Sequence, residues 1–81
     1  MNYYAYETRY CGPTNSKGAK IKVREMGFDG FTAISYDYEH NILQNHQRAA
    51  MATHSSLAGK DLEIVSTKSL KKGYLVIGVM R

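Results

Sequence analysis

The sequence predicts an α+β fold: an antiparallel sheet of about five strands, in βββαββ order, packed on one helix. Three observations predict it. Five segments show either the apolar–polar alternation of a strand or a short apolar run bounded by turn residues. One longer segment has helical spacing. The 81 residues contain one proline and no linker or repeat, so residues 1–81 are expected to form one domain.

The first strand is predicted over residues 3–10. Alternate positions share a face of a strand, so one face carries Tyr4, Tyr6, Thr8 and Tyr10. Residues 11–18 then break the pattern. They hold the chain's only proline and two glycines, which predicts a loop with demanding backbone angles.

The second and third strands are predicted over residues 19–26 and 31–38, joined by a short hairpin connection at 27–30. The second strand alternates between an apolar and a basic face. Its apolar face carries Ile21 and Val23, and its basic face carries Lys20, Lys22 and Arg24.

The helix is predicted over residues 42–56. Asn41 is a favourable N-cap, and Gln44 stands three residues later, which is the spacing of a capping box. One helical face repeats every seven residues at Leu43, Ala50 and Leu57. The inner face is rich in small residues, so the helix can lie close to the sheet, and Gly59 ends the segment.

The last two strands are predicted over residues 61–67 and 74–80, with a turn at 68–73 between them. The fifth strand is apolar on both of its faces. This pattern is typical of a strand that lies inside a sheet or is covered on both sides.

Charge and composition narrow the function. The formal net charge is +4 and 43% of the residues are hydrophobic, which excludes a disordered chain and an acidic DNA mimic. A basic surface favours nucleic acid or an acidic protein as partner. Cys11 is the only cysteine, so no intramolecular disulfide can form. With no signal-like or membrane-spanning segment, we expect a cytoplasmic protein that does not bind membranes.

Chemistry-bearing residues are sparse. His40, His46 and His54 are six and eight residues apart, which does not suit one metal ion, and we expect the latter two at the helix surface or its boundary. The loop at 12–18 has glycines and a lysine but joins two strands, unlike a phosphate-binding P-loop. With no paired carboxylates and no triad, we expect no enzymatic activity, no metal and no cofactor.

Basic and tyrosine side chains are the strongest candidates for binding. The candidate set is Tyr6, Arg9, Lys17, Lys20, Lys22, Arg24 and Tyr36. Tyrosine and arginine suit the anchors of a protein interface, whereas tyrosines could also stack nucleobases, as could Tyr3, Tyr4 and Tyr38. A third interpretation is structural, because alternating lysines protect a sheet edge from aggregation.

The stretch from residue 10 to 22 resembles a pattern in small proteins of phages, plasmids and related mobile elements, YxGPTNxxGxxIK. Residues 34–38, which precede the Asn-initiated helix, and residues 70–74, in the closing hairpin, also resemble segments of those proteins. The resemblance implies a non-catalytic cytoplasmic protein that inhibits a host defence complex by occupying a functional surface, as anti-CRISPR proteins do. The alternative is a basic nucleic-acid-binding accessory or regulatory protein. The expected partner is a host protein complex, with or without nucleic acid; monomer and homodimer both stay open.

Overall fold

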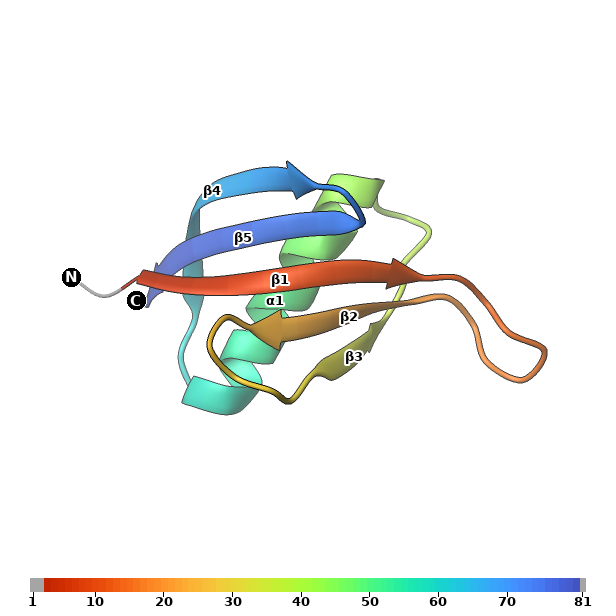
Figure 1. Ribbon diagram of the computed structural model, residues 1–81, viewed down its shortest axis with the longest axis horizontal. Helices are drawn as coiled ribbons and strands as arrows, with labels where there is room; N and C mark the ends of the chain where they lie inside the picture. The colour runs from red at the N-terminus through yellow and green to blue at the C-terminus, as the bar shows by residue number, and fades with distance from the viewer. Residues whose placement is uncertain (1–2, 81) are drawn as a thin grey trace.

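One helix covers one face of a five-stranded antiparallel sheet (Figure 1), which confirms the predicted α+β fold. This computed structural model describes residues 3–80. The elements follow in the predicted order: β1 (Tyr3–Cys11), β2 (Lys20–Glu25), β3 (Thr32–Ser35), α1 (Ile42–Ala58), β4 (Leu62–Leu70) and β5 (Gly73–Met80).

The strand order across the sheet is β3-β2-β1-β5-β4, so the first strand lies in the middle. β1 pairs with β2 on one side and with β5 on the other, both antiparallel. β3 and β4 form the two edges (Figure 1). Residues far apart in the chain therefore meet at the centre of the sheet; Arg9, for example, lies between Lys22 and Gly73.

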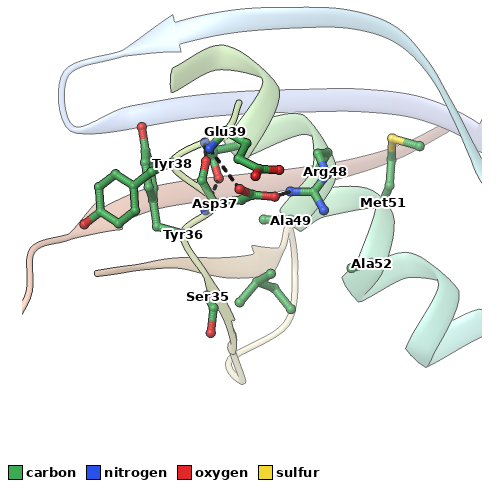
Figure 2. Close-up of a pocket in the computed structure, with 11 residues that line it drawn as sticks. Ser35, Tyr36, Asp37, Tyr38, Glu39, Arg48, Ala49, Met51 and Ala52 are labelled. Atoms are coloured by element: carbon green, nitrogen blue, oxygen red, sulfur yellow. Dashed lines mark hydrogen bonds and ion pairs between the residues drawn. The ribbon is translucent and has the colours of Figure 1, made fainter. Parts of the chain in front are cut away.

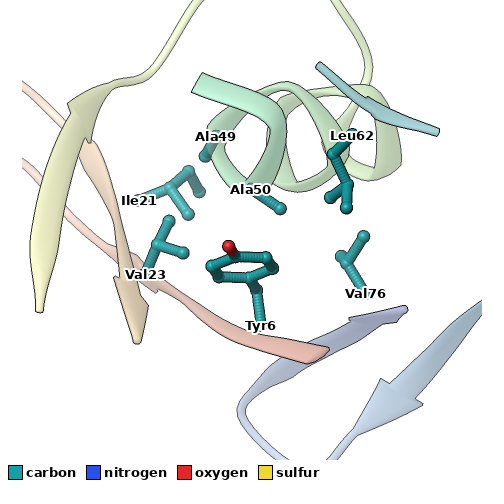
Figure 3. Packing of buried hydrophobic residues seen from close by; sticks show 7 residues of the cluster. All are labelled: Tyr6, Ile21, Val23, Ala49, Ala50, Leu62 and Val76. Carbon is teal, nitrogen blue, oxygen red and sulfur yellow. The ribbon is translucent and has the colours of Figure 1, made fainter. Parts of the chain in front are cut away.

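The core lies between α1 and the sheet. Figure 3 shows the Tyr6 ring beneath the helix, with β2 side chains on one side of it and β4 and β5 side chains on the other. The two helix residues in the cluster are alanines, which let the helix backbone approach the sheet closely. The cluster consists of Tyr6, Ile21, Val23, Ala49, Ala50, Leu62 and Val76.

The third strand is shorter than predicted, because it ends at Ser35 and not near residue 38. The buried side chain of Asn45 holds the segment that follows. Its Oδ1 accepts from the Asp37 backbone N–H at 2.7 Å. Its Nδ2 donates to the carbonyls of Asp37, His40 and Asn41 at 2.8, 3.2 and 3.0 Å. This clasp turns the chain from the sheet into the helix.

Both ends of α1 carry the predicted caps. Asn41 accepts from the Gln44 backbone at 2.7 Å, and the Gln44 side chain accepts from the Asn41 backbone at 3.1 Å, which completes the capping box. Gly59 caps the other end with φ of 70°, a left-handed conformation that favours glycine. The helix runs to Ala58, two residues beyond the predicted end.

The hairpin of β4 and β5 is tighter than predicted. β4 continues to Leu70, so the turn is formed by residues 71–72 alone. The β4 register shifts between Ile64 and Ser66, which marks a bulge in this edge strand. A bulge breaks the regular hydrogen-bond ladder and so protects an edge from pairing with another chain.

His46 and His54 are buried, so the expectation that they lie at the helix surface or its boundary was wrong. The Thr8 hydroxyl donates to the Tyr74 carbonyl at 3.2 Å, and therefore accepts from His46 Nδ1 at 2.7 Å. Burial, with smaller effects from Glu25 and Tyr4, raises the pKa of Tyr6 to about 12. The protonated Tyr6 hydroxyl has only His54 Nδ1 to donate to, at 2.5 Å. Hydrogen bonds with Tyr6 and Thr8 of β1 therefore allow both histidines to be buried.

We expect the protein to lose stability as the pH falls below about 6.5, the ordinary pKa of histidine. Burial lowers the pKa of His46 in the folded state. The unfolded chain therefore binds more protons between the lowered value and about 6.5, and His46 contributes a slope of up to ~1.4 kcal/mol per pH unit there. Urea unfolding at a series of pH values measures this slope. If the free energy of unfolding depended on pH in the same way in His46→Gln, the loss of stability could not be assigned to His46.

Candidate functional site

The face of the sheet turned away from α1 has no cover among residues 3–80 (Figure 1). Side chains alternate along a strand, so the neighbours of buried Tyr6, Thr8 and Val23 point to this side. We call it the open face. Its main side chains are Tyr3, Ala5, Glu7 and Arg9 of β1, Lys20, Lys22 and Arg24 of β2, Lys68 and Leu70 of β4, and Leu75, Ile77 and Val79 of β5.

One half of the open face is basic. Arg9 lies directly opposite Lys22 in the β1–β2 register, and Lys20 lies opposite Cys11. Like charges in directly opposite positions destabilise a sheet, so this pair is not explained by folding. Only Arg24 has an acidic partner in this group, because its Nη2 lies 3.0 Å from Glu7 Oε1.

An exposed ring extends the basic half toward the edge strand. The Lys22 Nζ lies 4.7 Å from the centroid of the Phe31 ring, a cation–π contact. Phe31 is 62% exposed although it is large and apolar. The contact holds the lysine in place beside Arg9, so the charge is presented in a defined position.

The other half of the open face carries an aliphatic row on β5, beside Glu63, Ser66 and Lys68 of β4, and the sequence did not reveal it as a site. Leu75, Ile77 and Val79 follow one another on β5 and are only partly buried. In the register they lie beside Glu7, Ala5 and Tyr3 of β1. The two-sided apolar pattern of residues 74–80 was the available signal. β5 lies inside the sheet as predicted, but α1 covers only the side that carries Val76.

The predicted site residues are only partly brought together. Arg9, Lys20, Lys22 and Arg24 gather on the open face. Lys17 lies in the β1–β2 loop, where its backbone closes a turn with Thr14. That loop extends past the end of the sheet (Figure 1).

Tyr6 and Tyr36 do not belong to this surface. Tyr6 is 1% exposed and hydrogen-bonded in the core, so its prediction as an interface anchor was wrong. Tyr36 faces the helix side, packed against the core and against the rings of Tyr10 and Tyr38. Both tyrosines stand at alternate positions that point to the helix side. The residue type alone does not show whether a tyrosine in a strand points inward or outward.

Two lysines from the second hairpin, Lys71 and Lys72, border the basic half, whereas Lys68 lies on the far side of the β5 aliphatic row. Lys68 lies opposite Leu75 and points to the open face. Lys71 and Lys72 form the turn and line the same depression as Arg9. The topology therefore brings Lys71 and Lys72 from the second hairpin beside Arg9 of β1.

A larger hollow lies elsewhere, and its polar residues Asp37 and Asn45 are bonded within the fold. A groove of about 720 Å³ runs between the segment after β3 and the helix (Figure 2). Asp37 accepts from the Glu39 backbone at 2.9 Å and pairs with Arg48 at 3.5 Å. Asn45 is fully used by the clasp described above. We interpret this groove as structural, because its residues Asp37, Arg48 and Asn45 already bond with groups of the fold.

Comparisons of the chain with protein-family models, with curated proteins and with solved structures give no match. No helix within residues 3–80 has both the length and the apolar character needed to cross a membrane.

Proposed function

We propose that the protein acts by binding, and that its open face docks on an acidic surface of a protein partner. One observation carries the proposal. A row of aliphatic side chains on β5 shares the face that α1 does not cover with the β1 and β2 cations Arg9, Lys20 and Lys22, which form no ion pair within residues 3–80. Apolar contact provides affinity, and the cations select an acidic partner and fix its orientation.

A protein partner is favoured over nucleic acid by the placement of the aromatic rings. Binding of single strands needs rings that stack on bases beside the basic groove. On the open face only Tyr3 and Phe31 provide such rings, and they lie apart from each other in the register. Tyr4 and Tyr36 pack on the helix side. Aliphatic side chains such as Ile77 have no role in binding phosphate.

The resemblance to mobile-element proteins makes a host defence complex the partner to test first. A typical interface covers about 800 Å² on each partner. That is roughly one seventh of the 5517 Å² surface of this chain. Bound in this way, the protein would block a functional surface of the complex by occupying it, with no chemical step.

Reversing the charge at Lys22 is expected to weaken partner binding by tenfold or more, because it removes a cation from the centre of the basic half. Lys60→Glu is the matched control. It changes the net charge by the same amount but lies in the connection between α1 and β4, outside the sheet. Pull-down from host lysate, with and without nuclease, followed by titration of the captured partner, measures the effect. Equal losses in both variants would indicate a general charge effect.

The apolar half has its own matched pair. Leu75→Ser is expected to weaken binding by about tenfold, whereas Leu43→Ser, on the exposed surface of α1, should leave it unchanged. Thermal unfolding of both variants checks that each is folded. Recovery of nucleic acid alone, with affinity falling steeply with salt and unaffected by Leu75→Ser, would overturn the proposal in favour of nucleic-acid binding.

A further inference from the structure

A second cavity lies on the helix side, away from the aliphatic row of the open face. It has a volume of about 460 Å³ and lies between the β2–β3 connection and the C-terminal half of α1. We call it the hairpin cavity. Its lining residues are Val23, Glu25, Phe28, Phe31, Thr53 and Leu57, with Gly30 and Thr32 at the connection.

Two polar side chains in the hairpin cavity have no partner. Thr53 is 1% exposed, and its Oγ1 makes no hydrogen bond. Buried hydroxyls are nearly always hydrogen-bonded, so an orphan of this kind calls for an explanation. The partly buried Glu25 carboxylate also forms no hydrogen bond or ion pair with residues 3–80. It is still close enough to contribute to the raised pKa of Tyr6.

The walls of the cavity are apolar and more than half exposed. Phe28 and Phe31 are each 62% exposed and Leu57 is 65% exposed. Burying such side chains against a ligand is favourable. Aromatic rings also attract cations through their faces, which adds to the effect of the carboxylate.

The C-terminal end of α1 adds to the negative electrostatic potential in the cavity. Leu57 belongs to the last turn of α1, where the helix dipole places partial negative charge. No basic side chain occupies that turn. The carboxylate, the ring faces and the helix end therefore favour the same kind of ligand.

We propose that the hairpin cavity binds an organic cation with an apolar body, such as an alkylammonium group. The ammonium group would donate to the Glu25 carboxylate and to the Thr53 hydroxyl, while the apolar body packs against Phe28, Phe31 and Leu57. The same chemistry is found in a lysine side chain of a protein partner and in a free amine. This site shares Phe31 with the edge of the open face, but its other residues are not part of that face, so it does not rest on the function proposed there.

Titration of the isotope-labelled protein with phenethylamine at pH 7, followed by backbone NMR shifts, tests the proposal. We expect saturable shifts at the residues of the cavity with a Kd on the order of 1 mM, as suits a ligand of about nine heavy atoms. The neutral analogue 2-phenylethanol should bind at least tenfold more weakly. Equal binding of amine and alcohol, or shifts centred elsewhere, would overturn the proposal.

Two variants separate the roles of the polar groups. Glu25→Gln should weaken amine binding by about tenfold and leave alcohol binding unchanged, because it removes only the charge. Glu39→Gln, in the groove of Figure 2, is the matched control and should have no effect. Thr53→Val should weaken amine binding severalfold without lowering the unfolding temperature, since it removes a hydroxyl that has no partner in the fold. Amine binding unchanged in Glu25→Gln would contradict the proposal.

A titration with peptides distinguishes the two possible sources of the cation, a lysine side chain of a protein and a free amine. A capped Leu-Lys-Leu tripeptide that shifts the same residues more strongly than phenethylamine, and more strongly than capped Leu-Gln-Leu, would identify a lysine of a protein partner. Stronger binding of the amine would identify a small molecule. Failure of both the amine and the lysine peptide to bind would overturn the assignment.

Discussion

Replacing Gly73 by alanine is expected to lower the free energy of unfolding by more than about 3 kcal/mol, or to prevent folding altogether. Gly73 begins β5 beside Arg9 of the central strand. A Cβ atom there would overlap the carbonyl oxygen of Thr8 and lie 2.8 Å from its carbon. Both contacts are with backbone, so relief requires β1 and β5 to move apart. Urea unfolding followed by circular dichroism measures the loss.

Gly30→Ala is the matched control for this prediction. A Cβ atom at Gly30 meets nothing within 4 Å, and its φ does not lie in the left-handed region. We expect that variant to stay within about 0.5 kcal/mol of the original protein. If Gly73→Ala proved as stable as Gly30→Ala, the close approach of β1 and β5 would be wrong.

Asn45→Ala is expected to cost about 3 kcal/mol or more. The substitution removes the side chain that bonds four backbone groups between residues 37 and 41. It also leaves a cavity and unpaired backbone groups where the chain enters α1. Unfolding by urea gives the overall loss, and amide exchange at Asp37 shows whether the clasp itself has opened.

Gln47→Ala provides the comparison on the same helix. Gln47 makes one side-chain hydrogen bond, from its Nε2 to the Thr67 hydroxyl at 3.0 Å. We expect a loss of about 1 kcal/mol or less for that variant. Equal losses at residues 45 and 47 would show that the clasp adds nothing beyond an ordinary hydrogen bond.

The architecture could be predicted because local patterns determine it. Alternation in β2 separated its apolar face from its basic face correctly, and the capping box at Asn41 located the helix start. The end of β3 could not be predicted in this way. It depends on hydrogen bonds from Asn45 of the following helix, which strand propensity does not include.

The candidate site was only partly predictable for a related reason. The basic side chains of β2 were visible in the sequence, but their meeting with Arg9 and the β5 aliphatic row depends on strand order. Tyr6 has the polar tip of an interface anchor, yet its hydroxyl bonds with a buried histidine in the core. Polarity alone did not show that Tyr6 and Thr8 of β1 form hydrogen bonds with histidines of α1.

The central position of β1 determines how the protein can assemble during folding. The β1–β2–β3 hairpins and the β4–β5 hairpin each pair neighbours in the chain, so both can form early and locally. The sheet becomes continuous only when β1 pairs with β5, some 70 residues away. Closing so long a loop is slow and favours a late step. Two hairpin units therefore join along the seam between β1 and β5. The basic and apolar halves of the open face lie on opposite sides of this seam, so the open face exists only after the two units have joined.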